Sequence, residues 1–136
     1  MIDEIVADIE ECEDPREQFE LLIELGDQAE ALDDKWKIEN FRVQGCTSNV
    51  WLVALPEDDS PSGLKFMADS DAHLVRGLVT LVLHLVKDKT AEQIAAYDFE
   101  TKFDELGLAR HLSSARSNGL KSMADRVRQL AAGTAA

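Results

Sequence analysis

Residues 50–87 read VWLVALPEDDSPSGLKFMADSDAHLVRGLVTLVLHLVK, and the spacing of apolar residues changes half-way along this stretch. Residues 50–55 are rich in β-forming residues and nearly all apolar, which is typical of a buried strand. Residues 56–63 supply Pro, Asp, Ser and Gly, the usual residues of a turn, and apolar side chains alternate over residues 64–68. Strands joined by a short loop pair antiparallel. The stretch therefore predicts a β-hairpin.

A helix is expected to follow directly, over residues 72–87, with Asp69 or Ser70 as its cap. Its apolar side chains cover most of the circumference: Leu74, Val75, Leu78, Val79, Leu81, Val82, Leu85 and Val86. A helix that is apolar on most of its sides is buried. We therefore expect this helix to be the centre of the fold.

Shorter segments with helical spacing flank the hairpin and the central helix. Before the hairpin we expect a helix over residues 2–11 and a helix from Asp14 and Pro15, which ends at Gly26 or continues for another turn over residues 27–32. A short strand over Phe41–Val43 follows. After the central helix we expect a helix opened by a Thr90–Gln93 capping box, a helix over residues 100–106, and a last helix capped by Ser113 or Ser114. The predicted class is α+β, a small antiparallel sheet packed against several helices. The 136 residues suit one domain.

The net charge of −13 arises in the first 34 residues, which hold fourteen acidic residues and one base, Arg16. Such a chain is a poor partner for nucleic acid, because phosphate binding requires clustered Lys and Arg. The acidic part is either a solvated helical surface or an attachment surface for a basic partner. No apolar run is long enough for a membrane span, and the acidic start is unlike a targeting peptide. We expect a cytoplasmic protein.

Residues 41–51, FRVQGCTSNVW, place Cys46 in a small polar turn ahead of the first strand, four residues after Arg42. Gly45 leaves one side of the sulfur open, and Thr47 and Ser48 offer hydroxyl groups. From these residues alone, a reactive and a structural thiol are equally supported. The second cysteine, Cys12, shows no metal-ligand or CxxC spacing relative to Cys46, and both are expected to be free thiols.

The sequence gives less support to a metal site, a thiol hydrolase or a phosphate-binding loop. Three separated histidines, His73, His84 and His111, match no metal-ligand spacing, and we expect no metal site. Thiol hydrolysis would require one of them to lie within hydrogen-bonding reach of Cys46. The glycines are isolated, so no phosphate-binding loop is predicted.

Four motifs together resemble the SufE family. They are Gln44-Gly45-Cys46-Thr47-Ser48-Asn49-Val50-Trp51, Leu25-Gly26, Asp69-Ser70-Asp71-Ala72 with Arg76-Gly77-Leu78, and Leu112-Ser113 with Arg116 and Gly119-Leu120. They occur in the order of the family and cover about residues 19–127. Thr47 and Asn49 stand where the family often has Gln, which could alter the preference for a partner.

The resemblance implies a sulfur acceptor for a cysteine desulfurase of the SufS or CsdA kind. Cys46 would take up sulfur as a persulfide and pass it to an iron–sulfur scaffold of the SufBCD kind, while pyridoxal phosphate belongs to the desulfurase and this chain needs no cofactor. The resemblance also implies a mobile Cys46 loop with an apolar shelter, and Arg116 as a stabiliser of the thiolate. We expect Gln44, Gly45, Thr47, Ser48 and Asp71 to serve the loop or the partner. The alternative is an adaptor that binds the desulfurase or scaffold without carrying sulfur.

Overall fold

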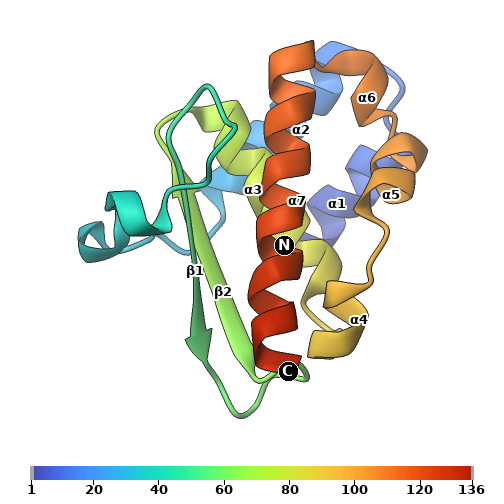
Figure 1. The fold of residues 1–136 in the computed structure, drawn as a ribbon. Coiled ribbons are helices and arrows are strands. Elements are labelled where there is room, and N and C mark those ends of the chain that lie inside the picture. The colour runs from blue at the N-terminus through green and yellow to red at the C-terminus, as the bar shows by residue number, and fades with distance from the viewer. Residues whose placement is uncertain (1, 136) are drawn as a thin grey trace.

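The computed structural model describes residues 2–135 and has the predicted α+β class (Figure 1). The elements are, in chain order, α1 (Ile2–Glu11), α2 (Pro15–Asp27), the 3₁₀ turns η1 (Asp34–Trp36) and η2 (Glu39–Phe41), β1 (Val50–Pro56), β2 (Leu64–Ser70), α3 (His73–Val86), α4 (Ala91–Ala95), α5 (Phe99–Glu105), α6 (Leu108–His111) and α7 (Ser114–Ala135). None of these helices is long and apolar enough to cross a membrane.

The hairpin is confirmed, with β1 and β2 antiparallel from the pair Val50–Ser70 to the pair Pro56–Leu64. β2 runs two residues beyond its predicted end at Ala68. The turn between the strands contains Gly63 in the left-handed region, at φ +74°, which glycine adopts without strain. Paired ends at Val50 and Ser70 bring the chain before β1 close to the start of α3.

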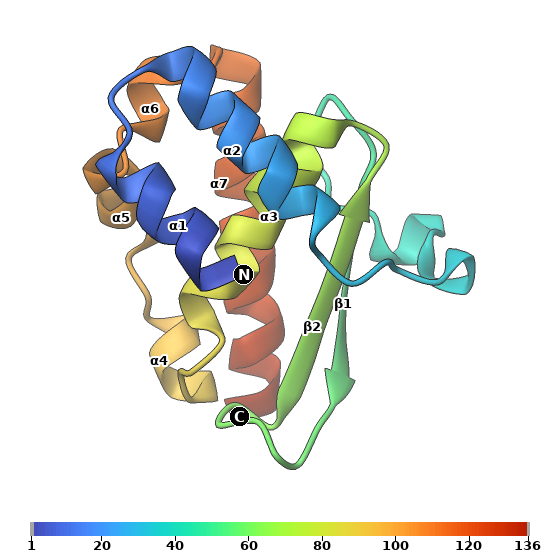
Figure 2. The same cartoon turned by 180° about the vertical axis from the view of Figure 1, so that it is seen from behind.

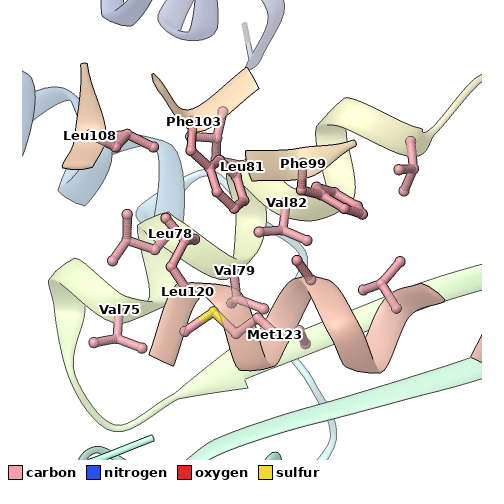
Figure 3. Close-up of a cluster of buried hydrophobic side chains, with 14 of the residues drawn as sticks. Val75, Leu78, Val79, Leu81, Val82, Phe99, Phe103, Leu108, Leu120 and Met123 are labelled. Atoms are coloured by element: carbon pink, nitrogen blue, oxygen red, sulfur yellow. The ribbon is translucent and has the colours of Figure 1, made fainter. Parts of the chain in front are cut away.

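α3 is the central helix, as predicted, with eight buried residues along its 14. α2 packs on one side of it and α7 on another, and β2 also contacts it (Figures 1 and 2). Figure 3 shows Val79 of α3 against Met123 of α7, and Leu81 near Phe103 of α5. These side chains belong to one apolar core that extends from α1 to α7.

Two glycines set the close crossing of α2 and α3. A Cβ on Gly77 would overlap the carbonyl oxygen of Leu22, and a Cβ on Gly26 would come within 2.8 Å of the Gly77 nitrogen. Gly26 was one expected end of this helix and a further turn over residues 27–32 was the other; α2 ends at Asp27, one residue after Gly26. Gly26 is therefore a packing residue, because only glycine lets the two backbones approach so closely.

Two local predictions were wrong. Phe41–Val43 is no strand: η2 occupies residues 39–41, and the chain then pairs with β1 through an isolated bridge between Arg42 and Trp51. Neither Asp69 nor Ser70 caps α3, whose N-cap is Ala72 without a side-chain hydrogen bond. Asp69 is instead buried at the end of β2, where it binds Arg76 at 2.7 Å and Lys37 at 3.3 Å.

Candidate functional site

Cys46 lies in the loop of residues 44–49, which joins the bridge at Arg42 to the start of β1. The backbone closes the base of this loop, because the Val43 N–H donates to the Val50 carbonyl oxygen at 2.8 Å. Gly45 adopts φ +90°, a conformation that other residues rarely take. Figure 1 places this loop beside the upper part of α7.

The thiol of Cys46 is half-buried and points at α7. Its Sγ donates to the Gly119 carbonyl oxygen at 3.5 Å, and a Cβ added to Gly119 would lie 3.4 Å from the sulfur. A cavity of about 10 Å³ adjoins the thiol, with room for roughly one water-sized atom. Most of its walls are apolar or small, and the residues that line it with Cys46 are Thr47, Ser48, Val75, Leu78, Ala115, Arg116, Gly119 and Met123.

Asp71 holds the far end of the loop. Its carboxylate accepts from the Asn49 backbone N–H at 3.1 Å and from the Asn49 side-chain amide at 3.0 Å. The Ser70 hydroxyl donates to the Asn49 carbonyl oxygen at 2.7 Å. The Asp71 backbone N–H also donates to the Asn49 carbonyl oxygen at 3.3 Å, so Asp71 ties the end of the loop to the start of α3.

Burial raises the pKa of the Cys46 thiol, and the nearby Arg42 guanidinium acts in the opposite direction. The neutral thiol is therefore the form that the retracted loop favours. A thiol in a released loop would regain its ordinary pKa, so a rise in pH through that ordinary range destabilises the retracted state relative to the released one. Deprotonation and exposure of Cys46 favour each other.

Arg42 is itself held by Glu39. The two form a bidentate pair with N–O distances of 2.9 and 3.1 Å, and the Gln44 side-chain amide also donates to Glu39 at 3.4 Å. The sequence placed Arg42 four residues before Cys46 but did not identify it as a functional residue. The i,i+3 spacing of Glu39 and Arg42 is the signal that could have suggested their pairing.

The residues singled out from the sequence gather around this loop. Gln44, Gly45, Thr47 and Ser48 belong to it, and Asp71 binds its end. Arg116 lines the cavity from the first turn of α7, but its guanidinium is exposed and the polar contact found for the thiol is to Gly119. The role of Arg116 towards the thiolate stays a prediction.

The histidines lie elsewhere among the described residues. His111 contacts the buried Gln18 at 2.7 Å, His84 lies 3.4 Å from Asp3, and His73 is exposed at the start of α3. None of the three hydrogen-bonds to Cys46 or lines its cavity. A thiol hydrolase built on Cys46 would therefore lack a histidine as its general base. The described part of the chain also contains no group of three or more His, Cys, Asp or Glu that could hold a metal ion.

A family model described as SufE, Fe-S metabolism associated domain, matches residues 3–131. The chain belongs to the SufE family. It is 40% identical over 129 residues to an uncharacterized SufE-like protein of Rhizobium etli, a match that covers 94% of this chain and 87% of that protein. It is 38% identical over 133 residues to an uncharacterized SufE-like protein of Rhizobium meliloti, with 97% and 95% covered.

The resemblance noted in the sequence is thus confirmed, and the SufE motifs meet in space. The Gly26 and Gly77 motifs form the α2–α3 crossing, while Asp71, Cys46 and Gly119 meet at the loop. In this SufE chain the motifs therefore divide into one set that fixes the helices and one set that surrounds the thiol.

Proposed function

We propose that this protein accepts sulfur on Cys46 from a cysteine desulfurase and delivers it for iron–sulfur cluster assembly. The family is described as associated with iron–sulfur metabolism, and the transfer step is our inference. The observation that carries it is the Cys46 thiol, which is packed on Gly119 beside a cavity of about 10 Å³. A space of this size can hold one additional atom on the Cys46 sulfur, such as the outer sulfur of a persulfide, but it is too small for a substrate molecule.

The transfer is a thiolate exchange at a sulfur–sulfur bond. The Cys46 thiolate attacks the terminal sulfur of the desulfurase persulfide, a bond forms between that sulfur and Cys46 Sγ, and the bond to the desulfurase cysteine breaks. The desulfurase thiolate leaves with the electron pair, so no external oxidant or reductant is required. Removal of its persulfide frees the desulfurase for another turnover, which explains a stimulation of its activity.

For this attack the loop has to leave α7. The Val43–Val50 pairing at its base and the Asp71–Asn49 contacts are the fixed points, and three peptide units separate Val43 from Cys46. At about 3.5 Å for each residue, an extended chain can carry Cys46 on the order of 10 Å from Val43. Release of the Asn49 end would permit this reach, and return to α7 would shelter the persulfide from water and other thiols.

The partners follow from this chemistry. The donor is a desulfurase of the SufS or CsdA kind, which contributes the pyridoxal phosphate and generates the persulfide from L-cysteine. The recipient is an iron–sulfur scaffold of the SufBCD kind, and we place the protein in the cytoplasm.

The desulfurase assay with Cys46→Ser tests the proposal against a non-carrying adaptor. A carrier loses its stimulation of cysteine desulfuration entirely, because serine cannot form the persulfide, whereas an adaptor retains it. Cys12→Ser is the matched control, since Cys12 is also a free, half-buried thiol and should retain full stimulation. Retained stimulation in Cys46→Ser together with normal binding would support the adaptor.

A further inference from the structure

A polar groove of about 410 Å³ lies beside the Cys46 loop and has not been assigned a role above. One wall comes from residues 39, 40 and 42–44, and the other comes from α7, with Ser122, Asp125, Arg126 and Gln129. Gly45 contacts the same wall, because a Cβ at that position would come within 2.5 Å of the Ser122 hydroxyl. An occupant of the groove would therefore touch the chain that leads into the loop.

The charges in the groove are nearly all neutralised by their neighbours. Glu39 is paired with Arg42, and Asp125 is paired with Arg128 at 2.8 Å. Arg128 also binds Glu100 at 2.7 Å. Arg126 is half-buried, and among the described residues no hydrogen bond or ion pair is found for its guanidinium. The groove therefore offers one unsatisfied positive charge.

This charge lies on the side of the molecule away from the acidic helices. Figure 1 shows α7 in front, and Figure 2, from behind, shows α1 and α2 in front instead. The first 34 residues, which include α1 and α2, account for the net charge of −13. An acidic partner would be repelled by the α1–α2 face and would approach from the side of the groove.

We infer that Arg126 receives an Asp or Glu side chain of the sulfur donor protein when Cys46 engages it. This rests on the proposed function, because the loop then has to meet a donor and the groove adjoins it on the same face. A guanidinium forms its strongest hydrogen bonds with carboxylates, preferably in a bidentate geometry. A protein side chain fits this groove better than a free amino acid does, because the groove is open to solvent. Its two carboxylates, Glu39 and Asp125, are already paired and are not available to bind the ammonium group of an amino acid.

The test compares Arg126→Glu with Arg16→Glu in binding to the cysteine desulfurase from the same genome. Both changes alter the net charge equally, but Arg16 is exposed in the first turn of α2, the helix that lies in front in Figure 2. Arg126→Glu should slow association by roughly tenfold at low salt, with the difference shrinking as salt rises, because contacts at the edge of an interface act mainly on the association rate. Arg16→Glu should associate at least as fast as the parent, and Arg126→Lys should fall between them.

Three further readouts separate the possible failures. Thermal unfolding and the iodoacetamide alkylation rate of Cys46 without partner should match the parent in Arg126→Glu, which shows that fold and loop are intact. Equal association by all variants would overturn the inference while leaving sulfur transfer standing, whereas a parent protein that takes up no sulfur would overturn the proposed function. Saturable calorimetric binding of L-cysteine that Arg126→Glu abolishes would assign the groove to a small amino acid instead.

Discussion

Glycine brings two pairs of elements together in this protein, with opposite consequences. At the α2–α3 crossing, Gly77 lies against the Leu22 carbonyl group, and the side chains of Leu22 and Leu78 are fully buried. At the Cys46 loop, Gly119 lies against the Cys46 thiol, which is half-buried and adjoins a small cavity. The first contact joins two continuous helices, and the second joins a helix to six residues of loop.

The difference lies in what each contact would lose on opening. Separating α2 from α3 would expose Leu22, Leu25 and Leu78, all fully buried. Lifting the loop would break the thiol contact and the bonds that Ser70 and Asp71 make to Asn49, at a cost of about 1 kcal/mol for each bond. A segment with few buried apolar contacts opens far more easily than the global fold. We therefore expect the loop to open more easily than the helix crossing.

The largest expected effect is on the helix crossing. Gly77→Ala places a Cβ where the Leu22 carbonyl oxygen lies, so α2 and α3 must separate, and we expect a loss of about 3 kcal/mol in the free energy of unfolding. Urea denaturation measures it. Gly133→Ala is the control, since a Cβ there meets nothing within 4 Å and should leave stability unchanged or slightly raised. An unchanged free energy of unfolding in Gly77→Ala would mean that the helix crossing opens as easily as the loop.

Removal of the Asp71 carboxylate tests whether it holds the loop. Asp71→Ala deletes both side-chain bonds to Asn49 and keeps the backbone bond between the two residues. The fraction of molecules in which Cys46 is exposed should rise by about tenfold, since 1.4 kcal/mol corresponds to that factor. The alkylation rate of Cys46 reports it. Asp98→Ala is matched, because Asp98 also accepts two hydrogen bonds, both from Thr101, at the start of α5. Equal rates in the two variants would show that Asp71 does not restrain the thiol.

A smaller change is expected when the cavity is narrowed. Gly119→Ala introduces a Cβ 3.4 Å from Sγ, which crowds the thiol and leaves less room for a second sulfur. We expect alkylation about threefold faster and a persulfide that is lost more rapidly to a small thiol, with no loss of stability because alanine favours the helix. An unchanged persulfide lifetime would argue against the cavity as its shelter.

The smallest effect concerns the charge of Arg42. Arg42→Gln removes the positive group that lowers the pKa of Cys46, so that pKa should rise further above its ordinary value. Alkylation near neutral pH should slow by about twofold, and the midpoint of its pH profile should move to higher pH. Lys35→Gln, on the exposed η1 turn, serves as the control. An unchanged midpoint would show that Arg42 does not affect the pKa of Cys46.

Local patterns in the sequence sufficed for some elements and not for others. The hairpin follows from apolar alternation and turn residues, and the Thr90–Gln93 capping box is present as predicted. Gly26 resembled a helix end because local sequence does not reveal that another backbone, 51 residues away at Gly77, lies against it. The crossing exists only in the tertiary structure.

The same limit applies to the thiol site. Asp69 was expected to cap α3, yet it binds Arg76 and Lys37. Asp71 was expected to serve the loop or the partner only from the resemblance, and it binds Asn49 across 22 residues. The position of Cys46 in a polar turn before a strand was visible in the sequence. Its contact with Gly119, 73 residues away, required the packing of α7 on α3.

The most direct test of sulfur transfer is mass spectrometry after incubation with the desulfurase, pyridoxal phosphate and L-cysteine. We predict one additional sulfur atom on the peptide that contains Cys46, removable by dithiothreitol, and none on the Cys12 peptide. A chain that stimulates the desulfurase while Cys46 stays unmodified, or that carries the sulfur on Cys12, would contradict it.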